Sequence, residues 1–176
     1  MLSEEVRPSR EIRERKTKTP EQALAQLMRL AARAEKSSGD ARRLMRGWGL
    51  CPTDAERVLA RLVADRFIDD QRYADAFVRE KVRLSGWGEY KIRQALQRKQ
   101  IAKEVIDRAL TQIPREGMGE RLLAKLSHKL PAIKAATDYD RRSKLLRYGL
   151  SLGYDFETVR DCVAQILKCE DECSEF

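Results

Sequence analysis

Hydrophobic positions recur at helical spacing from about residue 20 to residue 166. The segment TPEQ at 19–22 has the form of an N-cap with a capping box, and Leu24 and Leu27 begin an apolar face directly after it. Similar stripes with three- and four-residue steps follow to Ile166. No part of the pattern requires a strand. The pattern therefore predicts an all-α protein whose first helix covers about 20–36.

Turn and capping residues separate the stripes. Ser38-Gly39 is expected to end the first helix, Asp40 to cap the second, and the 53–56 segment to open the third with a capping box. One of the adjacent carboxylates Asp69 and Asp70 is expected to cap the fourth. This carboxylate pair could also bind a cation, but capping explains both residues without one.

The stripes repeat with a period of 51 to 53 residues. In each repeat the middle helix ends in a step to an apolar residue: Gly49-Leu50, Gln100-Ile101 and Gly153-Tyr154. The third helix of each unit begins a few residues later. Such a period is typical of stacked helical units. We therefore predict three tandem three-helix repeats that form an elongated, curved array.

The repeats and the chain ends divide the sequence into five segments. We expect a polar N-terminal arm at 1-19, three-helix repeats at 20-68, 69-114 and 115-168, and an acidic C-terminal tail at 169-176. The arm and the tail offer little apolar surface to pack, so both are expected to be poorly ordered.

Charge narrows the class of partner. The 176 residues include 36 Lys and Arg against 28 Asp and Glu, which gives a formal net charge of +8. The excess is concentrated in the middle of the chain, since 79–103 holds eight basic residues and two acidic ones. This imbalance favours a polyanionic partner, either a nucleic acid or a protein bound to one.

The basic residues of two equivalent short helices are predicted to form one stripe along the array. A merely solvated face is the alternative, but the scarcity of acidic residues beside them favours a binding surface. The candidate partner- or DNA-binding residues are Arg42, Arg43, Arg46, Arg72, Lys81, Arg83, Lys91, Arg93, Arg98 and Lys99.

Trp48 and Trp87 lie beside glycines, close to these basic residues. Each could stack on a nucleic-acid base. We favour packing between repeats, because tryptophan is the largest apolar filler in a chain with few aromatic residues.

No catalytic, cofactor-binding or metal site is predicted. The chain has one histidine, His128, which is expected on the surface, and four cysteines without a CxxC pair, of which Cys162 is expected in the core. It has no phosphate-binding GxxxxGK loop. We therefore predict a protein that is not an enzyme. The absence of a long apolar run predicts a cytoplasmic protein that does not associate with membranes.

Two stretches resemble a known family. The sequences FIDDQRYADAFV at 67–78 and GWGEYKIRQAL at 86–96 resemble signature segments of RecX regulatory proteins, and the region 144–159 resembles that family's third repeat. Two positions depart from the family pattern. Gln100 stands where glycine is usual, and Gly149 stands where an apolar side chain is usual. We expect Gly149 to loosen its helix and to leave core volume unfilled, at a cost of about 1 kcal/mol.

The resemblance implies a fold of three tandem three-helix repeats and a function. RecX-like proteins are cytoplasmic, non-enzymatic modulators that lodge in the groove of the RecA filament on single-stranded DNA and usually inhibit its ATPase and strand exchange. By this likeness the chain is expected to modulate the RecA filament. It is expected to be a monomer, and weak direct binding of bare DNA is left open. The alternatives are a direct, non-sequence-specific DNA-binding module and a helical adaptor for another protein.

Overall fold

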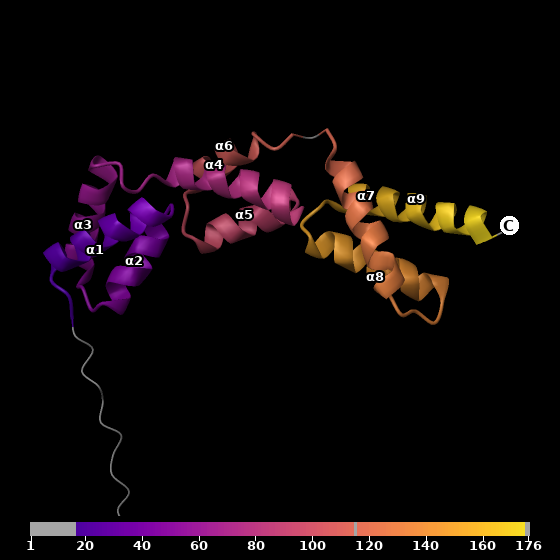
Figure 1. Ribbon diagram of the computed structural model, residues 1–176, viewed down its shortest axis with the longest axis horizontal. Coiled ribbons are helices and arrows are strands. Elements are labelled where there is room, and N and C mark those ends of the chain that lie inside the picture. Colours follow the sequence, from indigo (N-terminus) through magenta and orange to yellow (C-terminus); the bar gives the residue numbers. More distant parts are fainter. Residues whose placement is uncertain (1–16, 115, 175–176) are drawn as a thin grey trace, which may run out of the picture.

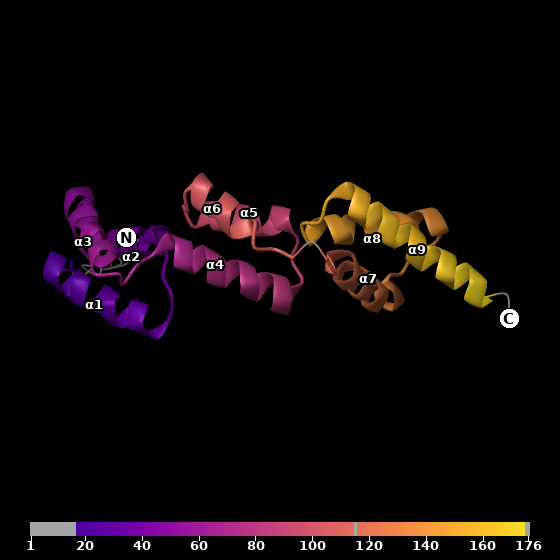
Figure 2. The ribbon, with the colours of Figure 1, turned by 90° about the horizontal axis from the view of Figure 1, so that it is seen from above.

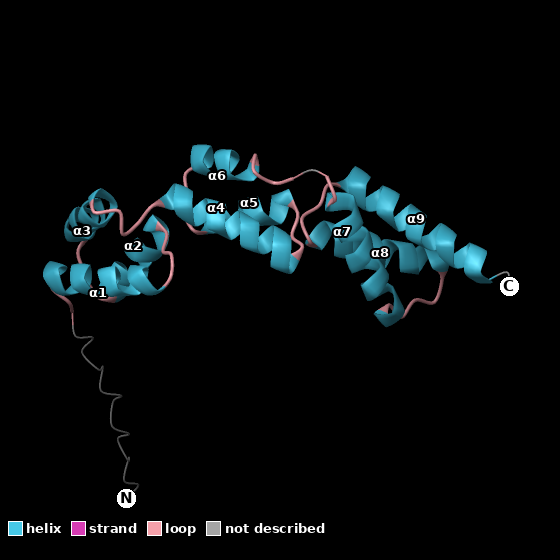
Figure 3. Cartoon of the chain, turned by 45° about the horizontal axis from the view of Figure 1, so that its top comes forward, coloured by secondary structure: helices cyan, strands magenta, loops and turns pink. Residues whose placement is uncertain are grey.

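A computed structural model describes residues 17–114 and 116–174 of the chain. Over these residues the chain is helical and contains no strand (Figure 3). Most of the arm expected at 1-19 lies outside the described residues, as do the last two residues of the expected tail. The final helix runs to Ser174, so the segment expected as a tail is largely helical.

The helices form three modules of three along the chain. Module 1 contains α1 (Pro20–Arg33), α2 (Ser38–Gly47) and α3 (Pro52–Ala64). Module 2 contains α4 (Asp70–Glu80), its π-helical continuation η1 (Lys81–Ser85), α5 (Glu89–Arg98) and α6 (Lys103–Leu110). Module 3 contains α7 (Met118–Lys129), the 3-10 turn η2 (Leu130–Ala132), α8 (Asp138–Ser151) and α9 (Phe156–Ser174).

The modules follow one another along the long axis (Figure 2), and the row bends into an arch (Figure 1). Each module packs its own apolar cluster. The fully buried side chains at the three centres include Leu27, Met45 and Leu62, then Ile92, Leu96 and Ile106, and then Leu122, Leu126 and Leu145. Burying one such side chain contributes about 1.5–3 kcal/mol. The predicted all-α fold and its elongated, curved array of three-helix repeats are confirmed.

Two of the predicted helix caps are present. The hydroxyl of Thr19 accepts from the Gln22 backbone N–H at 3.3 Å, and the Gln22 side chain accepts from the Thr19 N–H at 3.2 Å, which completes the capping box. Asp69 caps α4 by accepting from the Arg72 N–H at 3.0 Å. Local spacing was sufficient to identify both caps.

Two other caps were predicted wrongly. Ser37 caps α2 by accepting from the Asp40 N–H at 3.0 Å, so Asp40 lies inside the helix. Cys51 precedes α3, which starts at Pro52 rather than within the 53–56 segment. A proline has no N–H to leave unpaired and its φ already suits a helix, so α3 begins there.

The middle helices α2, α5 and α8 follow one another head to tail along the array (Figure 1). Between modules 2 and 3, the N–H of Gly88 donates to the Leu152 carbonyl at 2.8 Å, and the N–H of Tyr90 donates to the Gly153 carbonyl at 3.1 Å. The N-terminus of α5 therefore lies against the last turn of α8. This arrangement places the positive end of one helix dipole on the negative end of the next.

The same arrangement holds between modules 1 and 2. Gly39, in the first turn of α2, lies so close to the end of α5 that a Cβ built on it would be 2.0 Å from the Lys99 carbonyl oxygen. The three middle helices end in residues of positive φ, at +79° for Gly49, +59° for Gln100 and +89° for Gly153. These positions are the ones that the sequence repeat had aligned.

The expectation that Gly149 leaves core volume unfilled was wrong. A Cβ on this residue would lie 2.5 Å from Cγ1 of Val159, so the space beside the glycine is filled by α9. The glycine permits a close approach of α8 and α9 instead of leaving a void.

Candidate functional site

Four of the ten predicted binding residues meet where α2 joins α5. Arg43, Arg46, Arg98 and Lys99 line a hollow of about 130 Å³, which we call the junction hollow. The backbone contact at Gly39 brings the end of α5 to the start of α2, and thereby brings together two pairs of residues that are about 50 positions apart in the sequence.

A buried carboxylate pairs with two of these four cations. Asp40, only 7% exposed, accepts from Nζ of Lys99 at 2.9 and 3.0 Å and from Arg43 at 2.7 Å. Lys99 thereby ties module 2 to module 1. Arg46 and Arg98 are exposed and form no ion pair with any residue that the structure describes. These two arginines are the cations of the hollow that remain available to a partner.

Arg42 lies beside the junction hollow but is engaged with module 1. Its guanidinium donates to both carboxylate oxygens of Glu56, at 2.7 and 3.1 Å. This hydrogen bond raises the pKa of Arg42 and lowers the pKa of Glu56. The pair joins α2 to α3, so Arg42 helps to hold the helix that presents Arg46.

Arg72 and Arg93 are paired in the same way. Arg72 donates to Glu35 at 2.7 Å, between α4 and the segment after α1. Arg93 donates to Asp107 and, at 3.0 Å, to Glu89. Hydrogen bonds to these carboxylates raise the pKa of both arginines. Their positive charge is thus largely balanced by the protein itself.

Lys81 and Lys91 both lie over the Trp87 ring, with Nζ 5.5 and 4.7 Å from its centroid. Lys81 also pairs with Glu80 at 2.7 Å. Trp87 packs against the core of module 2, and its ring meets the Phe77 ring edge to face at 6.4 Å. Such contacts stabilise the packing of an indole within its own module.

Trp48 has a similar environment in module 1. It packs against that module's core, and Nζ of Lys18 lies 4.7 Å from its ring centroid. Both tryptophans therefore contact the core of the module to which they belong.

A second basic hollow, of about 490 Å³, lies between η1 and α7. Arg83 was among the predicted residues, whereas Arg121, Lys125 and His128 were not. The spacing of the last three residues places them on one face of α7, and this is the signal that could have identified them. We call this site the α7 hollow.

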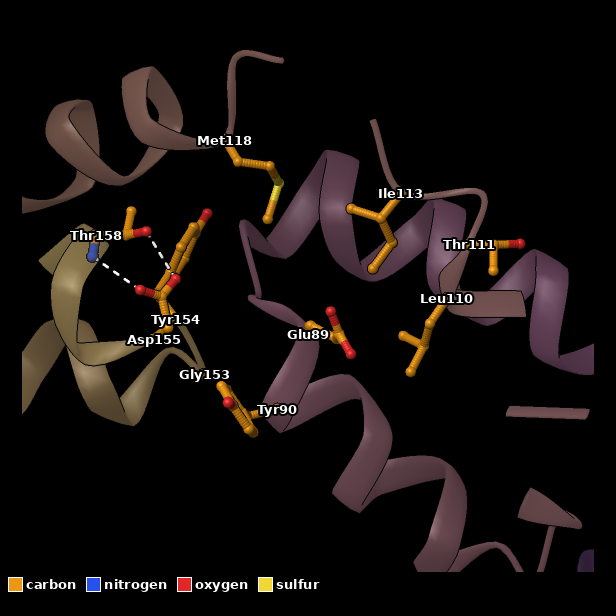
Figure 4. A pocket seen from close by; sticks show the side chains of 10 residues that line it. All are labelled: Glu89, Tyr90, Leu110, Thr111, Ile113, Met118, Gly153, Tyr154, Asp155 and Thr158. Atoms are coloured by element: carbon orange, nitrogen blue, oxygen red, sulfur yellow. Dashed lines mark hydrogen bonds between the residues drawn. The ribbon is translucent and has the colours of Figure 1, made fainter. Parts of the chain in front are cut away.

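A cleft of about 520 Å³ lies between modules 2 and 3 (Figure 4). Its lining residues are Glu89, Tyr90, Leu110, Thr111, Ile113, Met118, Gly153, Tyr154, Asp155 and Thr158. Among the described residues, its lining combines apolar side chains with two carboxylates and no basic side chain, so this lining is chemically unlike that of the two basic hollows.

Two polar groups in this cleft are held differently. Asp155 accepts from the Thr158 N–H at 2.8 Å and from the Thr158 hydroxyl at 2.7 Å, and these hydrogen bonds lower the pKa of Asp155 (Figure 4). The Tyr154 hydroxyl is buried and has no hydrogen-bond partner among the described residues. Burial raises the pKa of Tyr154.

The described part of the chain offers no other chemistry of this kind. No group of three or more His, Cys, Asp or Glu residues there is arranged to hold a metal ion. Asp69 caps α4, while Asp70 accepts from the N–H and hydroxyl of Ser38 at 2.8 and 2.6 Å. None of the described helices is both long enough and apolar enough to cross a bilayer.

Known sequences resemble this chain over most of its length. The family model of the RecX second three-helix domain matches residues 69–110. The regulatory protein RecX of Vibrio parahaemolyticus is 35% identical over 121 residues, which cover 68% of this chain and 72% of the relative. That of Clostridium botulinum strain Eklund 17B is 34% identical over 106 residues, which cover 59% of this chain but 49% of the relative. The match thus spans about half the length of the Clostridium protein.

Solved structures show the same fold. A crystal structure of regulatory protein RecX superposes with a TM-score of 0.71 at 24% identity, covering 79% of this chain and 68% of the other. RecX from Lactobacillus salivarius gives a TM-score of 0.71 at 15% identity, covering 85% of this chain and 97% of the other. The sequence matches together with the three-module fold show that the chain belongs to the RecX family of regulatory proteins.

Proposed function

We propose that this protein binds the filament of the RecA recombinase on single-stranded DNA and lowers its ATPase activity and strand exchange. Membership of the RecX family is the observation that carries the proposal. The protein would act without catalysis, as a monomer in the cytoplasm.

The shape of the molecule supports this function physically. An elongated, curved array can follow a helical groove and make several weak contacts at once, so that the contacts reinforce one another (Figure 1). Its net positive charge steers it toward a DNA-loaded filament, because opposite charge raises the rate of encounter.

Within the predicted set, we assign the partner contact to Arg46 and Arg98. Both are exposed in the junction hollow and unpaired among the described residues. Arg42, Arg72 and Arg93 form ion pairs between segments, so we assign them to holding the modules in shape.

The test is a titration into a RecA ATPase assay on single-stranded DNA. The wild-type protein is expected to inhibit, and the double variant Arg46→Glu/Arg98→Glu to need a concentration at least about tenfold higher for half-inhibition, since two attractive contacts become repulsive. Lys99→Glu is avoided, because it would set a carboxylate against the buried Asp40 and disturb the junction.

The matched control is Lys103→Glu/Arg108→Glu, the same charge change on two exposed positions of α6. It should inhibit nearly as well as the wild type. Circular dichroism should show equal helix content in all three proteins. Absence of inhibition by the wild-type protein would refute the proposed function, and equal losses in both variants would refute the assignment to the junction hollow.

A further inference from the structure

The described residues that line the α7 hollow include four basic side chains and no acidic one. Arg83 comes from η1, and Arg121, Lys125 and His128 come from α7. None of the four forms an ion pair with a residue in the described part of the chain. The described lining of the hollow therefore contains no carboxylate that balances this positive charge.

The absence of a carboxylate among the described lining residues distinguishes the α7 hollow from the junction hollow. In the junction hollow, Asp40 forms ion pairs with Lys99 and Arg43, and beside it Arg42 forms an ion pair with Glu56. Uncompensated like charges in a concave site raise the local potential and attract anions. The cations of the α7 hollow are thus less compensated by carboxylates than those of the junction hollow.

Local backbone structure creates the hollow. The π-helical turn η1 ends at Gly86, whose φ is +62°, and a Cβ there would lie 2.5 Å from Cε of Lys125. The lysine stem therefore lies against the turn. Leu84 of η1 is 70% exposed at the rim, although it is a large apolar residue.

An aromatic side chain completes the lining. Tyr148 of α8 contributes to the wall, and Nζ of Lys129 lies 5.7 Å from its ring centroid. Sequence-independent binding of single strands requires two parts. Cations follow the phosphate backbone, and an aromatic surface stacks on the bases. An acidic peptide would use the cations but would have no comparable use for the aromatic ring.

We propose that the α7 hollow binds single-stranded DNA directly, with phosphates held by Arg83, Arg121 and Lys125 and with a base against Tyr148. The site lies outside the junction hollow. It does not depend on a recombinase, so it is tested on bare DNA and its failure is separable from failure of the proposed function.

The experiment measures the anisotropy of a fluorescein-labelled oligothymidylate of about 20 nucleotides at several salt concentrations. The test variant is Arg121→Gln/Lys125→Gln. If each side chain neutralises one phosphate, the slope of log K against log salt falls by about 1.4. The same relation predicts about 60-fold weaker binding at about 50 mM salt and about tenfold at about 200 mM.

The matched control is Arg29→Gln/Arg33→Gln, which removes two exposed cations from α1. This control should keep the wild-type slope of log K against log salt. Tyr148→Leu should bind about tenfold more weakly with an unchanged slope, because it removes a stacking surface but no charge. Equal helix content in all variants shows that the fold is intact.

Three outcomes would overturn the proposal. Unchanged affinity in Arg121→Gln/Lys125→Gln would show that DNA does not occupy the hollow. Equal losses in this variant and in the α1 control would show that DNA responds only to the overall charge. If polyglutamate displaces the oligonucleotide from the wild-type protein at lower charge concentration than unlabelled oligothymidylate does, the occupant is an acidic protein segment.

Discussion

Replacing Gly39 by alanine tests the contact that joins modules 1 and 2. Two effects of opposite sign compete at this position. Alanine is favoured over glycine inside a helix by about 1 kcal/mol, so helix propensity alone predicts stabilisation. The new Cβ, however, would lie 2.0 Å from the Lys99 carbonyl oxygen, which is backbone and cannot rotate away.

The steric effect should prevail. Relieving the contact requires α2 to move from the end of α5 by more than an ångström, which disturbs the bonds of Asp40 to Lys99 and of Ser38 to Asp70. Forcing extra volume into a packed contact costs about 1–3 kcal/mol. We therefore expect Gly39→Ala to lower the free energy of unfolding by about 1–3 kcal/mol.

Gly47→Ala is the control, because it makes the same change in the same helix. A Cβ at Gly47 meets no atom within 4 Å, so this variant should be stabilised by up to about 1 kcal/mol. Urea unfolding followed by circular dichroism measures both variants, and thermal midpoints should shift by about 2–4 °C per kcal/mol. A Gly39→Ala protein as stable as Gly47→Ala would refute the close contact between the two modules.

Three further changes test individual residues. Gln100→Gly should raise the free energy of unfolding by about 0.5–1 kcal/mol, because the strain relieved at this left-handed position exceeds the cost of the extra entropy of glycine in the unfolded chain. A lower urea midpoint would contradict this. Tyr154→Phe should raise the free energy of unfolding by about 1 kcal/mol, because it removes a buried hydroxyl without a described partner. A thermal melt that shows destabilisation of that size instead would mean that the hydroxyl has a hydrogen-bond partner. Asp155→Ala should lower the free energy of unfolding by about 1 kcal/mol near neutral pH, because hydrogen bonds from Thr158 stabilise the ionised carboxylate and lower its pKa. The difference from the wild type should vanish as pH falls toward about 2, where the carboxylate is protonated. A difference in urea stability that persists in acid would exclude this origin.

The modules could be predicted from the sequence because each one buries an apolar stripe of its own. Spacing of Leu27, Ile92 or Leu145 within a single helix suffices to identify a buried face. The positions of positive φ were also accessible, since Gly49 and Gly153 occupy the same place in two repeats. Local patterns specify local structure, and most of this fold is local.

The functional surface was less predictable, because its charges depend on partners that are remote in sequence. Lys99 looked like part of a solvated stripe, yet it binds Asp40, 59 residues earlier. Asp40 looked like a helix cap, because an aspartate near a helix start usually is one. Which cations remain free is decided by how the modules meet, and no periodicity within one helix contains that information.

The α7 hollow was missed for a related reason. Arg83 and Arg121 lie on different modules and share a site only because η1 ends beside α7. The basic stretch 79–103 includes Arg93, which is paired, and excludes Lys125, which is not paired within the described chain.

The two junctions of the array are held by different forces, and this difference bears on function. Charged side chains contribute to the first, through Lys99 on Asp40, whereas the second rests on backbone hydrogen bonds from Gly88 and Tyr90. Salt weakens ion pairs that reach solvent but acts little on backbone hydrogen bonds. The bend between modules 1 and 2 should therefore be the more salt-sensitive of the two. A polyanion that binds Arg46 and Arg98 would act on that same bend, which would couple binding to curvature.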